Sequence, residues 1–143
     1  GMTGHQQNPT TGKNLRGEPA GKVDLEALCR AVGFNRVRVV DPYDLAEVDK
    51  VLKEELAAEE PSIIISRRPC VMIKGMTHRP ALHVDEDKCV GCKACMQIGC
   101  PAIKVSSRDG KAGKVAQIDT TLCIGCEVCT QMCKFDALKG AEA

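Results

Sequence analysis

The sequence contains few of the side chains that usually fill a protein core. Aromatic residues make up 2% of its 143 residues, with no tryptophan, one tyrosine and two phenylalanines. Metal–ligand bonds can replace part of the burial that large side chains supply in a small domain. The scarcity of aromatic residues therefore favours a domain built around an inorganic centre.

The chain also lacks an excess of charge and a long apolar segment. Its 20 basic and 19 acidic residues give a net charge of +1, which predicts no nucleic-acid surface. No apolar run approaches the ~18 residues of a membrane span, and residues 1–18 are too polar for a signal peptide. We therefore expect a cytoplasmic protein with neither a nucleic-acid nor a membrane partner.

Motifs for hydrolytic, nucleotide-binding or dinucleotide-binding chemistry are absent as well. The sequence has no recognisable nucleophile–base pairing, P-loop or Rossmann glycine fingerprint. We therefore predict no catalytic residue within this chain.

Cysteine, in contrast, is abundant, and eight of the ten cysteines form two near-copies of one motif. The first motif has the spacing C-x2-C-x2-C-x4-C and the second has C-x2-C-x2-C-x3-C, the arrangement of proteins that hold two [4Fe–4S] clusters. The first motif comprises Cys89, Cys92, Cys95 and Cys100, and the second comprises Cys123, Cys126, Cys129 and Cys133.

In two-cluster ferredoxins the fourth cysteine of each motif ligates the other cluster. This rule predicts two crossed ligand sets, which we call site I and site II. Site I comprises Cys89, Cys92, Cys95 and Cys133, and site II comprises Cys123, Cys126, Cys129 and Cys100. Gly91 and Gly125 precede the second cysteine of each triplet, where positive φ and close backbone approach are expected.

Zinc and disulfides are the alternative uses of these cysteines. Zinc sites use pairs of cysteines and leave no role for the third cysteine of each triplet. A disulfide framework does not suit the cytoplasmic location. Cys29 and Cys70 lie outside both motifs, and we predict that they are small buried core residues.

Four domain segments are predicted. Residues 1–22 form a loop or disordered tail, 23–72 a partial α/β domain, 73–82 a linker and 83–143 an α+β, ferredoxin-like two-cluster domain. Within the α/β segment the patterns predict, in order, a helix over 23–32, a strand over 36–40, a helix from Asp44 to about Glu60, and a buried parallel strand over 62–66.

The cluster region is an internal repeat with an offset of 34 residues, because Cys89-Val90-Gly91-Cys92 recurs as Cys123-Ile124-Gly125-Cys126. Between the two copies, residues 103–106 and 114–118 flank glycine-containing turn residues. This arrangement predicts a β-hairpin.

These residues carry a family resemblance. The cysteine pattern is similar to that of bacterial two-cluster ferredoxins, and the longer first motif (CMQIGCPAI, 95–103) resembles the alpha subunit of indolepyruvate:ferredoxin oxidoreductase. The strings MTGHQ (2–6), Asn8-Pro9 and PSIIISRRPC (61–70) resemble the end of that subunit's thiamine-diphosphate domain, so the resemblance covers nearly the whole chain.

The resemblance implies an oxidoreductase that decarboxylates 2-oxoacids such as indolepyruvate, in anaerobic electron transfer. Thiamine diphosphate with Mg2+ would form the intermediate, two [4Fe–4S] clusters would pass electrons to an external ferredoxin, and a beta subunit would complete the enzyme. The segments that hold Mg2+ and diphosphate are expected upstream of residue 2. The fragment alone is therefore expected to lack turnover, and thiamine diphosphate belongs to the full-length subunit.

Lys134 departs from the family pattern, which has proline after the last cysteine. A cation near site I favours the more negative reduced state, so we expect a raised reduction potential there. Two other functions stay open at this point: a stand-alone ferredoxin-like electron carrier and a zinc-binding interaction module. The α/β segment favours the oxidoreductase, because a free carrier has no need of half a parallel sheet.

Overall fold

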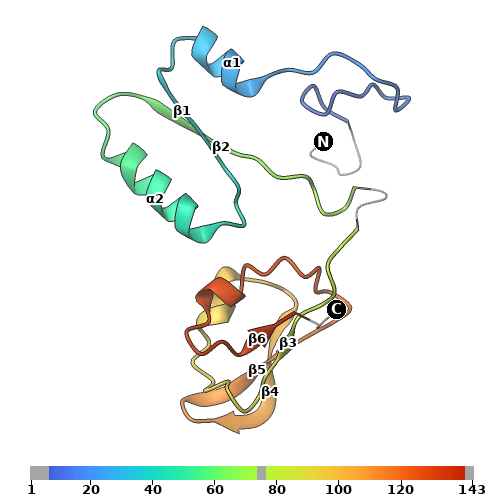
Figure 1. The fold of residues 1–143 in the computed structure, drawn as a ribbon, viewed down its shortest axis with the longest axis vertical. Coiled ribbons are helices and arrows are strands. Elements are labelled where there is room, and N and C mark those ends of the chain that lie inside the picture. The colour runs from blue at the N-terminus through green and yellow to red at the C-terminus, as the bar shows by residue number, and fades with distance from the viewer. Residues whose placement is uncertain (1–6, 74–76, 141–143) are drawn as a thin grey trace. The chain divides into compact units, whose positions relative to one another are not determined.

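The computed structural model describes residues 7–73 and 77–140. The ends of the predicted segments at 1–6, 74–76 and 141–143 lie outside the described residues. The chain divides into two compact units, residues 1–76 and 77–143 (Figure 1).

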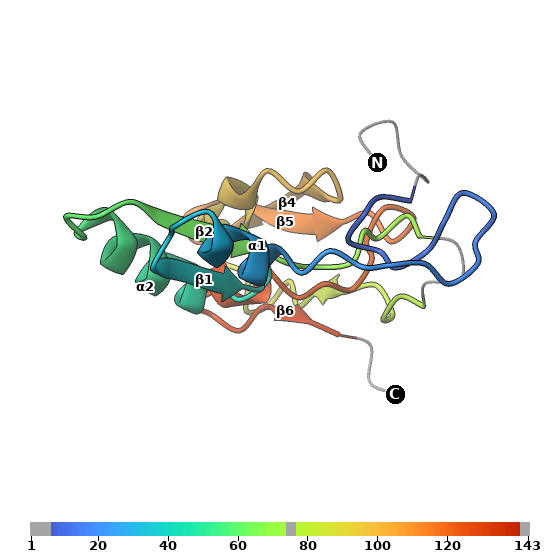
Figure 2. The ribbon, with the colours of Figure 1, turned by 90° about the horizontal axis from the view of Figure 1, so that it is seen from above.

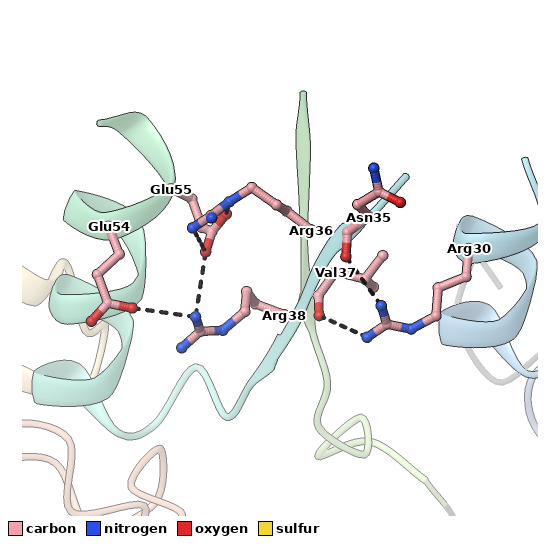
Figure 3. Close-up of polar contacts among 7 residues, drawn as sticks. All are labelled: Arg30, Asn35, Arg36, Val37, Arg38, Glu54 and Glu55. Atoms are coloured by element: carbon pink, nitrogen blue, oxygen red, sulfur yellow. Dashed lines mark hydrogen bonds and ion pairs between the residues drawn. The ribbon is translucent and has the colours of Figure 1, made fainter. Parts of the chain in front are cut away.

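The first unit contains one small parallel sheet and two helices. Its elements are α1 (Leu25–Ala31), β1 (Arg36–Val40), α2 (Leu45–Leu56) and β2 (Ser62–Ser66). Strands β1 and β2 pair in parallel, in a register that sets Arg36 opposite Ser62. Both strands have the predicted bounds, and α1 and α2 lie on either side of the pair (Figures 1 and 3). Residues 7–22 form turns with a single β-bridge between Lys13 and Pro19.

Both helices begin at an aspartate cap. The Asp24 carboxylate accepts hydrogen bonds from the amides of Glu26 and Ala27 at the start of α1. The Asp44 carboxylate accepts one from the Glu47 amide at 3.0 Å, as its position before the apolar stripe of α2 predicts. Helix α2 ends at Leu56, four residues before the predicted end.

One buried ion pair fastens α2 to β1. The Glu55 carboxylate accepts two hydrogen bonds from the Arg36 guanidinium, at 2.8 and 3.0 Å, and a third from Arg38 at 3.4 Å (Figure 3). The Glu55 side chain is only 2% exposed. Unpaired, its charge would be costly there, so the bidentate arginine contact fixes the helix on the sheet.

The second unit is built from two antiparallel strand pairs and two short 3-10 helices. The predicted hairpin is present as β4 (Ile103–Gly110) and β5 (Gly113–Ile118), which lie side by side in both views (Figures 1 and 2). The other pair, which the sequence does not predict, is β3 (His83–Val84) with β6 (Leu138–Lys139). The 3-10 helices are η1 (Ala94–Ile98) and η2 (Thr130–Met132).

The internal repeat is visible in the pairing of these strands. Val84 pairs with Leu138 in one sheet, and Ile118, which is 34 residues after Val84, pairs with Ile103 in the other. Beside each pair an aspartate amide donates to an alanine carbonyl, Asp85 to Ala137 at 2.7 Å and Asp119 to Ala102 at 2.8 Å. The two halves therefore have the same local structure.

Cysteines form part of the core of this unit. Its buried members are Leu82, Cys95, Ala116, Cys129 and Leu138. In the described parts of the chain, no helix is long and apolar enough to cross a membrane.

Candidate metal centres

The thiol of Cys95 lies among three other cysteines. Cys95 belongs to η1 and is buried at 9% exposure. Burial raises the pKa of its thiol, and the neighbouring thiols of Cys133, Cys89 and Cys92 raise it further. Three of these cysteines come from the first motif and one from the second, and they are the four cysteines of site I.

Cys129 has the corresponding place in the other half. It precedes η2, is 6% exposed, and burial raises the pKa of its thiol to about 12. The thiols of Cys126, Cys100 and Cys123 contribute next, followed by that of Cys95. The structure thus groups the four cysteines of site II, and the Cys95 contribution sets the two groups next to each other. Consistently, η1 and η2 pack together.

A cavity lies at site I. It holds about 430 Å³ of empty space, part of it open to solvent, and all four cysteines of the site line it. Leu138 and Met96 contribute apolar walls, and Lys93 and Phe135 contribute exposed ones.

Among the residues that the structure describes, three main-chain amides donate hydrogen bonds to cysteine sulfur. Two of them are related by the repeat: Leu82 donates to Cys123 Sγ at 3.4 Å, and Ala116 donates to Cys89 Sγ at 3.5 Å. The third runs from Ala137 to Cys133 Sγ at 3.4 Å. Site I thus receives two of these hydrogen bonds and site II receives one. Amides directed at sulfur stabilise negative charge on a thiolate.

The two motif glycines have the geometry that the sequence predicts. Gly91 has φ +77° and Gly125 has φ +65°. A Cβ at Gly91 would lie 2.0 Å from the Gly113 carbonyl oxygen, and one at Gly125 would lie 2.5 Å from that of Pro80. Each loop can approach the facing main chain this closely only because it has no side chain there.

Sequence reasoning missed a second equivalent pair in these loops. Lys93 and Glu127 both have φ +62°, and they lie 34 residues apart between the second and third cysteines of their motifs. The shared C-x2-C spacing could have indicated this left-handed turn. Because the two residues carry opposite charges, the two loops differ in their electrostatics.

The cysteine groups fit a cluster better than a single metal ion. Four thiol donors converge at each site. The raised pKa values of Cys95 at site I and of Cys129 at site II oppose thiolate formation at these two residues unless positive charge enters with the ligand. An iron–sulfur core supplies that charge. In the described ranges no three His, Cys, Asp or Glu side chains come close enough to hold one metal ion, as a mononuclear zinc site requires.

The two remaining cysteines lie apart from these groups, in the first unit. Cys29 is half-buried on α1, whereas Cys70 is exposed after β2. The prediction of a buried Cys70 is wrong, because β2 ends at Ser66 and residues 67–70 after it are all exposed.

Family models match both halves of the chain. Residues 1–66 match the thiamine pyrophosphate enzyme C-terminal TPP-binding domain, and residues 88–137 match the 4Fe–4S dicluster domain. The order of the two matches corresponds to the order of the two units.

Curated relatives match almost the entire chain. Indolepyruvate oxidoreductase subunits IorA from Thermococcus kodakarensis and Pyrococcus abyssi are 40% and 39% identical over 96% of the chain. The subunit of the same name from Archaeoglobus fulgidus is 34% identical over 100% of it. The chain spans 22% of the length of the first two relatives and 23% of the third, about a fifth.

Proposed function

Because the chain belongs to the family of the indolepyruvate oxidoreductase subunits IorA, we propose that it is the electron-transfer portion of a 2-oxoacid:ferredoxin oxidoreductase of the indolepyruvate type. The observation that carries the proposal is the crossed grouping of the cysteines. Cys133 of the second motif lies by Cys95 of the first, and Cys100 of the first lies by Cys129 of the second. Such crossing is the ligand pattern of two-cluster ferredoxins.

We assign one [4Fe–4S] cluster to site I and one to site II, with all eight motif cysteines as thiolate ligands. The clusters supply one-electron redox chemistry when bound. The protein contributes ligand geometry, the amide hydrogen bonds from Leu82, Ala116 and Ala137, and the apolar wall formed by residues such as Leu138. These features exclude water and adjust the potential.

The remaining parts of the proposal concern the rest of the enzyme. Thiamine diphosphate and Mg2+ are assigned to the full-length subunit, and this chain is expected to have no turnover by itself. Its partners would be a beta subunit and an external ferredoxin. The cysteines have to remain reduced before cluster assembly, which fits a cytoplasmic location. The match of residues 1–66 to a thiamine pyrophosphate domain favours this function over that of a stand-alone carrier.

A stopped-flow experiment without oxygen tests the proposal. The cluster-loaded chain is reduced with dithionite, freed of excess reductant and mixed with oxidised ferredoxin. We expect ferredoxin to be reduced, the Cys133→Ser variant to lose most of this transfer, and the Cys29→Ser control to retain it. A loaded chain that reduces no ferredoxin, or a Cys133→Ser variant that transfers like the parent, would contradict the proposed function.

A further inference from the structure

The internal repeat allows the surroundings of the two sites to be compared position by position. Between the first and third cysteines of the two motifs, residues 34 apart have matching positive φ angles, at Gly91 and Gly125 and at Lys93 and Glu127. A difference in charge or exposure between equivalent positions is therefore a property of one site and does not follow from the fold.

At site II the loop is covered and neutralised. Glu127 accepts a hydrogen bond from Arg79, and Cys126 beside it is half-buried. Gly125 packs under the carbonyls of Arg79 and Pro80. The segment that precedes β3 therefore covers this loop, and the charge of Glu127 is compensated.

At site I the equivalent loop carries a cation, and its residues Cys92 and Lys93 are exposed. Lys93 replaces Glu127, and Gly113, which has no side chain, replaces Arg79. Within the described ranges Lys93 has no ion-pair or hydrogen-bond partner for its side chain.

Further cations and one aromatic ring surround this loop. Lys114 and Phe135 line the same cavity as Lys93, and Phe135 is 46% exposed. Lys134, next to Phe135, is exposed and also has no ion pair among the described residues.

The nearby carboxylates offset the charge of Lys114 but not those of Lys93 and Lys134. Asp109 pairs with Lys114 at 2.8 Å, and Asp136 pairs with Lys88 at 3.6 Å. Each of these two carboxylates is therefore matched by another lysine, and Lys93 and Lys134 retain uncompensated positive charge around an exposed aromatic side chain. Interfaces commonly combine an aromatic anchor with a charged rim that selects the partner.

We propose that the site I face, formed by Lys93, Lys134 and Phe135, is the docking surface for a small acidic protein that carries single electrons. The inference rests on the proposed function, since it assigns a partner to site I. The charge of the surface specifies the electron carrier that it binds. Carboxylates around the carrier's redox centre would face the lysines, and Phe135 would be buried at the contact. The charge reversal at the equivalent position 127 disfavours the same contact at site II.

Binding to an acidic bacterial ferredoxin, in its oxidised form, tests this surface. The cluster-loaded chain is titrated anaerobically at low ionic strength by calorimetry, and iron and sulfide are measured on the same sample. We expect Lys93→Glu to weaken binding about tenfold, or ~1.4 kcal/mol, and Lys93→Glu with Lys134→Glu to weaken it further. Added salt should weaken the binding of ferredoxin to the parent chain and reduce the differences in affinity between the parent chain and the variants.

The chain itself supplies matched controls. Lys93→Glu introduces the residue that the equivalent position already carries at the same φ, so the fold is expected to tolerate it. Lys50→Glu makes the same charge change at an exposed lysine of α2 and should leave binding unchanged.

Each outcome decides either the docking surface or the proposed function. Weaker binding in Lys93→Glu but not in Lys50→Glu supports the surface. Equal weakening in both variants, or no binding by a chain with full iron and sulfide, overturns it and leaves the function standing. Failure to assemble clusters overturns the function instead. Dimerisation of the chain through this face, abolished by Lys93→Glu, would assign the face to a second copy and also overturn the proposal.

Discussion

The amide of Leu82 donates a hydrogen bond of 3.4 Å to the Sγ of Cys123, joining the start of the second unit to its second cysteine motif. The repeat reproduces this contact between Ala116 and Cys89 at 3.5 Å. Each half thus supplies an amide to the cysteine loop of the other half. The two sites should therefore assemble together, and predictions about one site can use the other as an internal reference.

The amide of Ala137 should raise the reduction potential of site I. Ala137→Pro removes this hydrogen-bond donor to Cys133. The negative charge that sulfur carries in the reduced state is then less well stabilised. We expect the site I potential to fall and the site II potential to stay unchanged, as measured by anaerobic redox titration followed by EPR. An unchanged site I potential in a variant with full iron content would refute this role.

Lys134 should act on the same potential through its charge alone. Lys134→Gln keeps the backbone and removes the cation, and Lys134→Pro restores the residue of the family pattern. At a separation on the order of 8 Å in water-like surroundings one charge contributes ~0.5 kcal/mol, roughly 20 mV for one electron. We expect both variants to lower the site I potential. A titration in which neither variant differs from the parent chain would show that the lysine has no influence.

Gly91 should be essential for site I because a side chain cannot fit there. Gly91→Ala would bring Cβ to 2.0 Å from the Gly113 carbonyl, so the loop must move away from β5. Gly99→Ala is the matched control, because Gly99 also has a positive φ, +67°, but nothing lies within 4 Å of its Cβ position. We expect reconstituted Gly91→Ala to lose iron and Gly99→Ala to retain it. Similar iron contents in the two variants would refute the steric argument.

The Arg36–Glu55 pair should make the first unit sensitive to acid. The hydrogen bond from Arg36 is the main cause that lowers the pKa of Glu55 below its ordinary value of 4.5, while burial opposes the shift. A carboxylate whose pKa is lower in the folded state stabilises the fold above its unfolded pKa. This stability is lost as the pH falls through the folded value.

Circular-dichroism melts of the full chain between pH 7 and pH 3 measure this effect. We expect the melting temperature of the first unit to fall with acid in the parent chain and to change less in Glu55→Gln. Glu54→Gln is the control, since that neighbouring side chain is 40% exposed and paired with Arg38. An equal response of the parent chain and Glu55→Gln would refute the prediction.

Local signals were sufficient to predict some elements and not others. The β-branched run at 62–66 and the Asp44 cap act on near neighbours, and β2 and the start of α2 were predicted correctly. Helix α1 begins at Leu25, two residues after its predicted start, because Asp24 caps it. Helix α2 ends at Leu56 with Ala57 as its C-cap, before the apolar pattern and Pro61 would end it; proline restricts only Glu60, the residue directly before it, so it does not account for the earlier end. The β3–β6 pair was missed because each strand has only two residues. Its partners, such as His83 and Lys139, also lie at opposite ends of the sequence of the second unit.

Some features of the candidate site could likewise be predicted from the sequence, and others could not. The cysteine spacing was sufficient to predict which cysteines the structure groups together, whereas their ligation to clusters stays a prediction. The amide donors and the unequal charge of Lys93 and Glu127 depend on which strand faces each loop, so they could be found only after the fold was known. Cys70 could not be placed from sequence, because its exposure depends on what covers the end of β2.

The central claim is that the eight cysteines hold two adjacent [4Fe–4S] clusters in crossed ligand sets. The most direct test measures iron, acid-labile sulfide and zinc per chain on protein prepared without oxygen, with EPR after dithionite reduction. The claim predicts about eight iron and eight sulfide per chain, with signals that interact magnetically. Stoichiometric zinc without sulfide, persisting after anaerobic reconstitution with iron and sulfide, would contradict it.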